Sequence, residues 1–176
     1  MGSRGGRRQG PPRHDMLLTR FGYPERNGSG GSPSLLSYER LIRDHGVIAA
    51  AAAALVRGLQ AEASPAELVE AVKRLDAVLT PHLAIEDEQI YPLLLASKDA
   101  GQRVTAREAI EAYAALSASW RTFVAKWDEA AIAADQARFT ADLDAILEMI
   151  QGRVRSENET LYPMALRAAH IRLRCG

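Results

Sequence analysis

Cysteine is almost absent from this sequence of 176 residues, in which Cys175 is the only example. A single cysteine cannot form an internal disulfide or supply half of a thiolate metal site. These facts exclude a disulfide scaffold and a thiolate-based zinc site. A reducing compartment follows most simply, and we expect a cytoplasmic protein.

Long apolar runs and an excess charge are missing as well. No apolar run approaches the ~20 residues that a membrane-spanning helix needs, and Met16-Leu17-Leu18 is too short for the apolar part of a secretory signal. Basic and acidic residues number 22 each, so the formal net charge is zero and gives no general case for nucleic-acid binding. We therefore expect neither a membrane nor a nucleic acid as a partner.

The first 33 residues differ in composition from the rest. They contain eight of the 13 glycines, four of the eight prolines and six of the 22 basic residues. Such a segment cannot bury enough apolar surface to offset the entropy lost on ordering. We expect residues 1–33 to be a disordered basic tail, residues 34–170 to be one folded domain, and residues 171–176 to be a short C-terminal tail. Met16 is an alternative start of translation.

The rest of the chain is patterned for helices. Alanine and leucine are abundant, aromatic residues make up only 6%, and apolar residues recur at three- and four-residue steps. The pattern predicts helices over about 34–61, 64–95, 104–129 and 135–169. Four helices of this length with short connections predict an all-α, antiparallel up-down four-helix bundle.

Local signals support individual elements of this bundle. Ser64-Pro65-Ala66-Glu67 combines a hydroxyl N-cap, a proline at the first helical position and a glutamate that completes a capping box. Asp135 is a candidate N-cap for the last helix. The alanine run 49–54 is expected where a neighbouring helix approaches closely.

An internal repeat relates the second and fourth predicted helices. Residues 82–95 (HLAIEDEQIYPLLL) align with residues 153–166 (RVRSENETLYPMAL) at a constant offset of 71 residues. Two hairpins related by a pseudo-twofold axis would bring Glu86 and Glu157 face to face across the core. Tyr91 and Tyr162 are expected to pack at the end of the bundle, and Asp87, Glu88 and Glu159 to face solvent.

Metal-binding residue types gather on the inner faces of these helices. His82 and Glu86 are four residues apart, so both side chains project from one face of a helix. His45 lies in the apolar stripe of the first helix. Together with Glu157 they offer two imidazoles and two carboxylates, enough for one iron, manganese or zinc ion by ligand type. Taken alone, His45 is better explained as a hydrogen-bonded core histidine, and only beside His82-x-x-x-Glu86 is a metal ligand an equally good explanation.

The order of these motifs resembles that of the hemerythrin-like HHE domain. Asp44-His45, then His82-x-x-x-Glu86 leading to Tyr91-Pro92, is similar to the first half of that domain, and residues 157–163 are similar to the end of its second half. The resemblance covers about residues 38–168. It implies a bundle with two irons, held by a histidine on each of the first and third helices and by His-x-x-x-Glu on the second and fourth, and a role in oxygen binding, gas or redox sensing, or iron storage.

The sequence departs from the family pattern at the second metal position. Arg153 stands where the fourth helix should carry a histidine, and the third helix has no histidine, with Tyr113 nearest the expected place. A guanidinium has no lone pair for a metal but pairs well with carboxylates. We hypothesise that Arg153 replaces the charge of the lost ion and holds Glu86 and Glu157. Tyr113 is either a core residue or a phenolate ligand at this position.

Two kinds of function follow from these residues. The first is a non-catalytic sensor or carrier with a single metal, iron before manganese or zinc, at His45, His82, Glu86 and Glu157, with a diatomic gas as its ligand. The second is a metal-free bundle, closed by Arg153, that regulates a protein partner. The sequence contains no recognisable nucleophile–base pair and no phosphate-binding loop, so we do not expect an enzyme.

Overall fold

The chain is described here by a computed structural model, which covers residues 35–168, with side chains from Tyr38 onward. Within this range all regular structure is helical. The elements are α2 (Leu35–Gln60), α3 (Pro65–Ile85), η1 (Glu86–Ile90), α4 (Tyr91–Leu95), α5 (Ala100–Tyr113), α6 (Leu116–Lys126), α7 (Glu129–Ala134), α8 (Gln136–Ser156), η2 (Glu157–Leu161) and α9 (Tyr162–Ala168). The expected tails, residues 1–33 and 171–176, lie outside the described residues.

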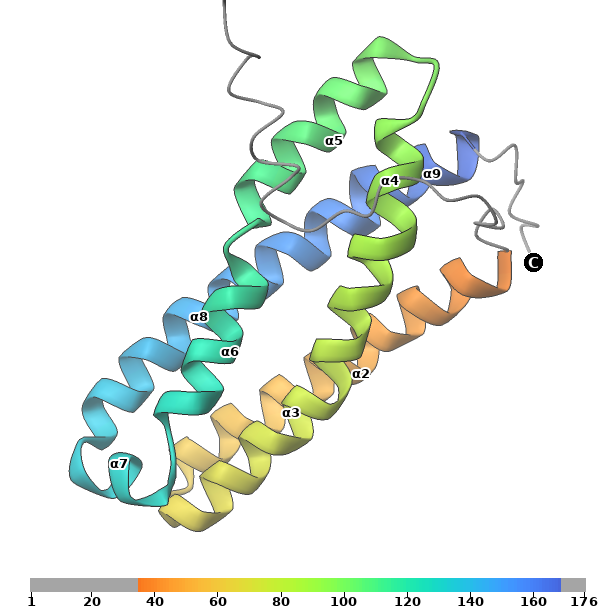
Figure 1. The fold of residues 1–176 in the computed structure, drawn as a ribbon. Helices are drawn as coiled ribbons and strands as arrows, with labels where there is room; N and C mark the ends of the chain where they lie inside the picture. The colour runs from red at the N-terminus through yellow and green to blue at the C-terminus, as the bar shows by residue number, and fades with distance from the viewer. Residues whose placement is uncertain (1–34, 169–176) are drawn as a thin grey trace, which may run out of the picture. The chain divides into compact units, whose positions relative to one another are not determined.

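These elements form four antiparallel helical columns (Figure 1). The first column is α2, the second α3 to α4, the third α5 and α6, and the fourth α8 to α9, while α7 lies in the connection between the third and fourth. Successive columns run in opposite directions, which confirms the predicted up-down bundle. None of the helices in residues 35–168 is long and apolar enough to cross a membrane.

Side-chain caps fix where the helices begin. The Ser64 hydroxyl accepts from the Glu67 N–H, and the Glu67 carboxylate accepts from the Ser64 N–H at 2.8 Å, so the predicted capping box is present. Asp135 caps α8 by accepting from the Arg138 N–H at 2.9 Å. Each cap satisfies backbone donors that the first turn of a helix leaves unpaired.

Both copies of the sequence repeat contain a π-helical turn. The Tyr91 N–H bonds to the Glu86 carbonyl, and the Tyr162 N–H bonds to the Glu157 carbonyl, each five residues back. A proline follows each tyrosine, and proline in an α-helix clashes with the carbonyl four residues before it. The wider turn accommodates that proline without ending the column. Each turn begins at one of the two repeated glutamates.

The third column differs from the single helix predicted over 104–129. It begins earlier, at Ala100, because the Asp99 carboxylate accepts from the Gly101 and Gln102 N–H groups. It breaks between Tyr113 and Leu116 and ends at Lys126, after which Asp128 caps the separate helix α7. The break contains no glycine, proline or capping side chain, so no local signal in the sequence could predict it.

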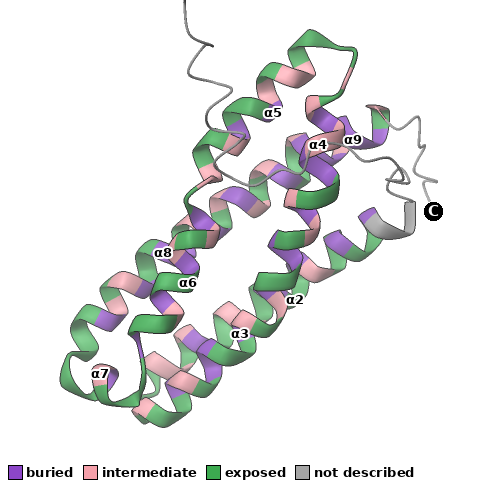
Figure 2. Cartoon of the chain, viewed as in Figure 1, coloured by how far each residue is buried: buried purple, intermediate pink, exposed green. Residues whose placement is uncertain are grey.

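Buried and exposed residues alternate along the helices (Figure 2). The buried residues form two apolar clusters, with a layer of polar residues between them. Along α2, Tyr38 and Leu41 belong to one cluster, Ile48 and Leu55 belong to the other, and His45 lies between them. The second and fourth columns repeat this order. Their intervening buried polar residues are His82, Glu86, Arg153 and Glu157. The first, second and fourth columns therefore contribute buried polar residues to one layer of an otherwise apolar interior.

Candidate metal centre

Five buried polar side chains make up this polar layer, which we call the core cluster: His45, His82, Glu86, Arg153 and Glu157. Each is at most 4% exposed. His45 comes from α2, His82 from the last turn of α3, and Arg153 from α8, while the two glutamates open the π-turns. The sequence prediction that Glu86 and Glu157 meet inside the molecule is therefore matched by the structure.

Arg153 bridges the two glutamates. Its Nε donates to Glu157 Oε1 at 2.6 Å, and one terminal nitrogen donates to Glu86 Oε2 at 2.9 Å. The same nitrogen also donates to Asp87 Oδ1 at 3.1 Å. The planar guanidinium has several donors in a fixed geometry, which suits it to hold two carboxylates from different helices. Burying both carboxylates without a counter-charge would be strongly unfavourable.

The tyrosine of each repeat copy donates a hydrogen bond to the glutamate of the other copy. Tyr91 donates to Glu157 Oε1 at 2.9 Å, and Tyr162 donates to Glu86 Oε1. Each glutamate thus accepts from Arg153 and from the tyrosine of the opposite repeat. The guanidinium carbon also lies 5.1 Å from the centre of the Tyr91 ring, within the range of a cation–π contact. The expectation that these tyrosines only pack at the end of the bundle was incomplete.

His45 is oriented by a hydrogen bond from its outer nitrogen. Nδ1 donates to Asn158 Oδ1 at 2.9 Å. Neutral His45 then keeps its lone pair on Nε2, which lies 3.2 Å from Glu157 Oε2 and 3.9 Å from Glu86 Oε1. A metal-binding histidine is commonly held in this way, with one ring nitrogen bonded to the protein and the other directed at the ion.

His82 has no hydrogen bond to any described residue. Both of its ring nitrogens are buried, and neither they nor Glu157 Oε2 has a hydrogen-bond partner. His82 Nε2 lies 3.4 Å from Glu86 Oε1, and Nδ1 lies 3.9 Å from Asp44 Oδ2. A buried polar atom without a partner costs free energy. Of these unpaired atoms, His82 Nε2 lies beside Glu86 and Glu157 Oε2 lies beside His45 Nε2, so these two indicate that a further group belongs between them.

The pKa values of the cluster reflect burial and mutual charge. Burial and the charge of Glu86 raise the pKa of Glu157. Burial alone would raise the pKa of Glu86 too, but the neighbouring His82 and Arg153 lower it below its ordinary value. Burial alone lowers the pKa of His45, but Glu157, Asn158 and Glu86 together raise it above its ordinary value. Burial keeps the pKa of both tyrosines high, so they remain hydrogen-bond donors.

Four residues of the core cluster could hold a metal ion. One ligand atom from each of His45, His82, Glu86 and Glu157 lies within 4.8 Å of all the others. Two imidazole nitrogens and two carboxylate oxygens suit iron, manganese or zinc. The other side of the carboxylates is occupied by Arg153, which cannot bind a metal. The guanidinium there pairs with both glutamates.

A comparison with protein-family models matches this arrangement. Residues 36–165 match the hemerythrin HHE cation binding domain. The chain belongs to this family. Neither a curated protein nor a solved structure matched it. The match covers the four columns and the core cluster, and the hemerythrin-like bundle predicted from the sequence is confirmed.

In this HHE domain, Tyr113 does not join the cluster. It is half-buried and lies against α8, where a Cβ added to Gly152 would be 3.6 Å from its hydroxyl oxygen. Within the described residues, Tyr113 has no hydrogen bond to Arg153, Glu86 or Glu157. The structure thus gives Tyr113 no hydrogen bond within the described residues through which it could replace the charge of a metal.

Sequence reasoning also missed several neighbours of the HHE site. Asp87 was expected to face solvent, but it is half-buried and pairs with Arg153. Asn158 and the tyrosines were not predicted as partners. Glu86 and Tyr91 are five residues apart, which on an ideal α-helix places them about 140° apart. Only the repeated Tyr-Pro pair could have indicated the π-turns that change this spacing.

Proposed function

We propose that this HHE domain is a non-catalytic binding protein that uses one metal ion, iron in the first place, to sense or carry oxygen, nitric oxide or redox state in the cytoplasm. The ion would be held by His45, His82, Glu86 and Glu157. A bound metal supplies a coordination position that a diatomic ligand can occupy. Manganese and zinc are the alternatives that the same ligands accept.

The observation that carries the proposal is the division of the cluster into two sides. On one side Arg153 spans both carboxylates with bonds of 2.6 and 2.9 Å. On the other side His82 Nε2 and Glu157 Oε2 have no hydrogen-bond partner among the described residues. On the first side the guanidinium of Arg153 is a permanent cation. On the second side an exchangeable metal ion would be the cation. The result is a family member with a mononuclear centre.

The protein's own residues would tune that centre. Tyr162 contacts Glu86 and lies with its hydroxyl 3.4 Å from His45 Nε2. Its ring stacks on the His45 ring at 5.4 Å between centroids and an angle of 6°. Asn158 and Tyr91 fix the orientation of His45 and Glu157. Such neighbours of metal ligands set their orientation and basicity. We infer that the two tyrosine hydroxyls and Asn158 hold the metal-binding side chains in place.

The test is spectroscopic. Protein purified without a histidine tag is loaded with Fe(II) under anaerobic conditions and then exposed to nitric oxide or to oxygen. We expect a new visible absorption band that is absent from His82→Ala and retained by Glu88→Gln, an exposed neighbour on the same π-turn. A band of equal strength in His82→Ala would overturn the proposed ligand set, and no spectral response of the loaded wild-type protein would overturn the gas-sensing role.

One observation favours a second candidate, a metal-free bundle that regulates a protein partner. Each glutamate already accepts from Arg153 and from one tyrosine, so both carboxylates are hydrogen-bonded without an ion. Thermal unfolding separates the candidates, because a bound metal stabilises the native state by mass action. A midpoint that neither Fe(II), Mn(II), Zn(II) nor a chelator changes supports the metal-free module and contradicts the sensor.

A further inference from the structure

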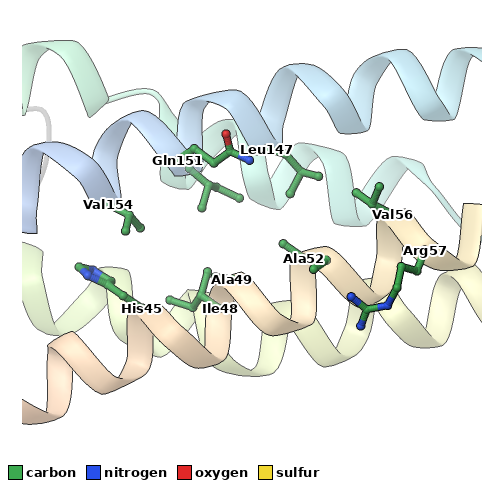
Figure 3. Close-up of a pocket in the computed structure, with 11 residues that line it drawn as sticks. His45, Ile48, Ala49, Ala52, Val56, Arg57, Leu147, Gln151 and Val154 are labelled. Atoms are coloured by element: carbon green, nitrogen blue, oxygen red, sulfur yellow. The ribbon is translucent and has the colours of Figure 1, made fainter.

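A pocket lies beside the core cluster and shares only His45 with it. This pocket of about 350 Å³ opens between α2 and α8 (Figure 3). His45 forms one end of its lining, and Arg57 lies at the other end. Most of the residues between them are apolar; those used below are Ile48, Ala52, Ala53, Leu147 and Ile150.

The alanine run of α2 explains why the pocket exists. The run was expected to allow a close helix contact. Ala51 and Ala52 do pack against the core, but on the side of α8 the small side chains of Ala52 and Ala53 leave space between the two helices. The floor is formed by Ile48, Leu147 and Ile150, which are between 1% and 7% exposed. The pocket is thus a groove with a buried apolar floor.

The groove has a single permanent charge. Among the described residues, Arg57 is the only lysine or arginine that lines it, and none of its lining residues is an aspartate or glutamate. Within the described residues Arg57 has no hydrogen bond or ion pair, whereas other arginines such as Arg40 and Arg138 pair with carboxylates on the same helix. Apolar walls with a few polar groups that fix orientation are typical of small-molecule sites, and the volume is at the lower end of their ~300–1,000 Å³ range.

We propose that this groove binds a free carboxylate with a medium-length, unbranched hydrocarbon chain. The chain lies over Ile48 and Ile150 beside the alanines, and the carboxylate pairs with Arg57. His45 and Arg57 are twelve residues apart on one helix, a separation of about 18 Å at the helical rise per residue. A groove of this length and volume accommodates one extended chain and is too small for the two chains of a membrane lipid.

The charges at the two ends set the orientation of the ligand. The His45 end adjoins Glu86 and Glu157, whose combined negative charge exceeds the single positive charge of Arg153. A carboxylate placed there would be repelled by two others. The Arg57 end has an unpaired guanidinium and no acidic lining. The methyl end of the ligand therefore points toward His45, and the head group stays near solvent.

The test is calorimetric titration of the metal-free, full-length protein with decanoate. The groove variant Ala53→Phe is compared with Ala54→Phe: both positions are exposed alanines on α2, but only Ala53 lines the groove. We expect Ala53→Phe to weaken binding by at least about tenfold, or ~1.4 kcal/mol, and Ala54→Phe to leave it unchanged. Equal binding by both variants would overturn the site.

The head group is tested with a second pair. Arg57→Gln removes the charge at the groove, and Arg43→Gln removes the same charge from an exposed position of α2 outside it. Because an exposed ion pair is weak, Arg57→Gln should reduce decanoate affinity about twofold to fivefold. Decanol should bind wild type with the affinity that decanoate has for Arg57→Gln, and acetate should not bind. Loss of affinity in Arg43→Gln to the same extent would contradict the role of Arg57.

A second copy of the chain is the competing occupant. Sedimentation velocity of wild type and Ala53→Phe tests for it. A dimer that Ala53→Phe dissociates, together with no decanoate binding, would overturn the proposal and make the groove a self-association surface. Because binding is measured without metal, this result is independent of the metal-dependent function proposed above.

Discussion

At the scale of single residues, the chemistry of this HHE domain depends on one replacement. Arg153 occupies the place in the repeat that His82 occupies in the other copy, and both precede a glutamate by four residues. The structure gives the two positions different partners: Arg153 bonds to both glutamates, while His82 has no hydrogen bond among described residues. We propose that of these two equivalent positions Arg153 replaces the charge of an ion and His82 is a metal ligand.

The cost of removing this guanidinium is predictable. Arg153→Ala leaves two buried carboxylates without their cation, and breaking a buried ion pair in this way costs ~3–5 kcal/mol. Urea unfolding of metal-free protein at neutral pH measures the loss. Arg155→Ala is the matched control, because Arg155 is exposed on the same helix, and its effect should stay within ~0.5 kcal/mol. Equal stability of the two variants would remove the charge-replacement account.

The sequence predicted the members of the core cluster better than it predicted their neighbours. His45, His82, Glu86, Arg153 and Glu157 could be found from helical periodicity and the internal repeat. Tyr113 was placed by counting residues forward from Tyr91-Pro92. Such a count gives a position along the chain but not the direction of the side chain, and Tyr113 lies against Gly152 instead of bonding to the core cluster. Hydrogen bonds between distant segments, such as that of Asn158 to His45, have no local signature.

At the scale of elements, the π-turns and the caps have different origins in the sequence. The capping box of α3 follows from four consecutive residues and was predicted correctly. The π-turns depend on how Pro92 and Pro163 fit into columns that continue past them, held by packing at both ends. Periodicity assumes 3.6 residues per turn, so it could not reveal the wider turns.

The capping box supplies a pH-dependent contribution to stability. Ser64→Ala removes the hydroxyl acceptor of α3 and should lower the free energy of unfolding by ~1 kcal/mol at neutral pH. Hydrogen bonds from the Ser64 side chain and backbone lower the pKa of Glu67 below its ordinary 4.5. The contribution of the Glu67 carboxylate is therefore present above pH 4.5 and is lost as the pH falls through the lowered folded-state value.

Glu67→Gln isolates this contribution. Its stability relative to wild type is followed by urea unfolding from pH 7 down into the acidic range. We expect the difference to be largest above pH 4.5 and to shrink on acidification, with Glu62→Gln, an exposed residue just before the box, as the control. A difference that grows toward acid would contradict the assigned direction of the Glu67 shift.

At the scale of the whole molecule, one polar layer between two apolar clusters organises the bundle. Three of its four columns contribute to this layer, and the third column breaks near it. The fold class, the antiparallel order and the facing glutamates could all be predicted from the sequence, because they follow from periodicity and the repeat. The groove beside His45 could not, because it depends on how far α8 stands from α2.

The central claim is that the paired glutamates are neutralised by one inorganic ion on one side and by Arg153 on the other. Anomalous diffraction at the iron edge, from crystals of tag-free protein loaded anaerobically with excess Fe(II), tests it most directly. The account predicts one anomalous peak per chain, among His45, His82, Glu86 and Glu157. A second peak on the Arg153 side, or no peak among these four residues, would contradict it.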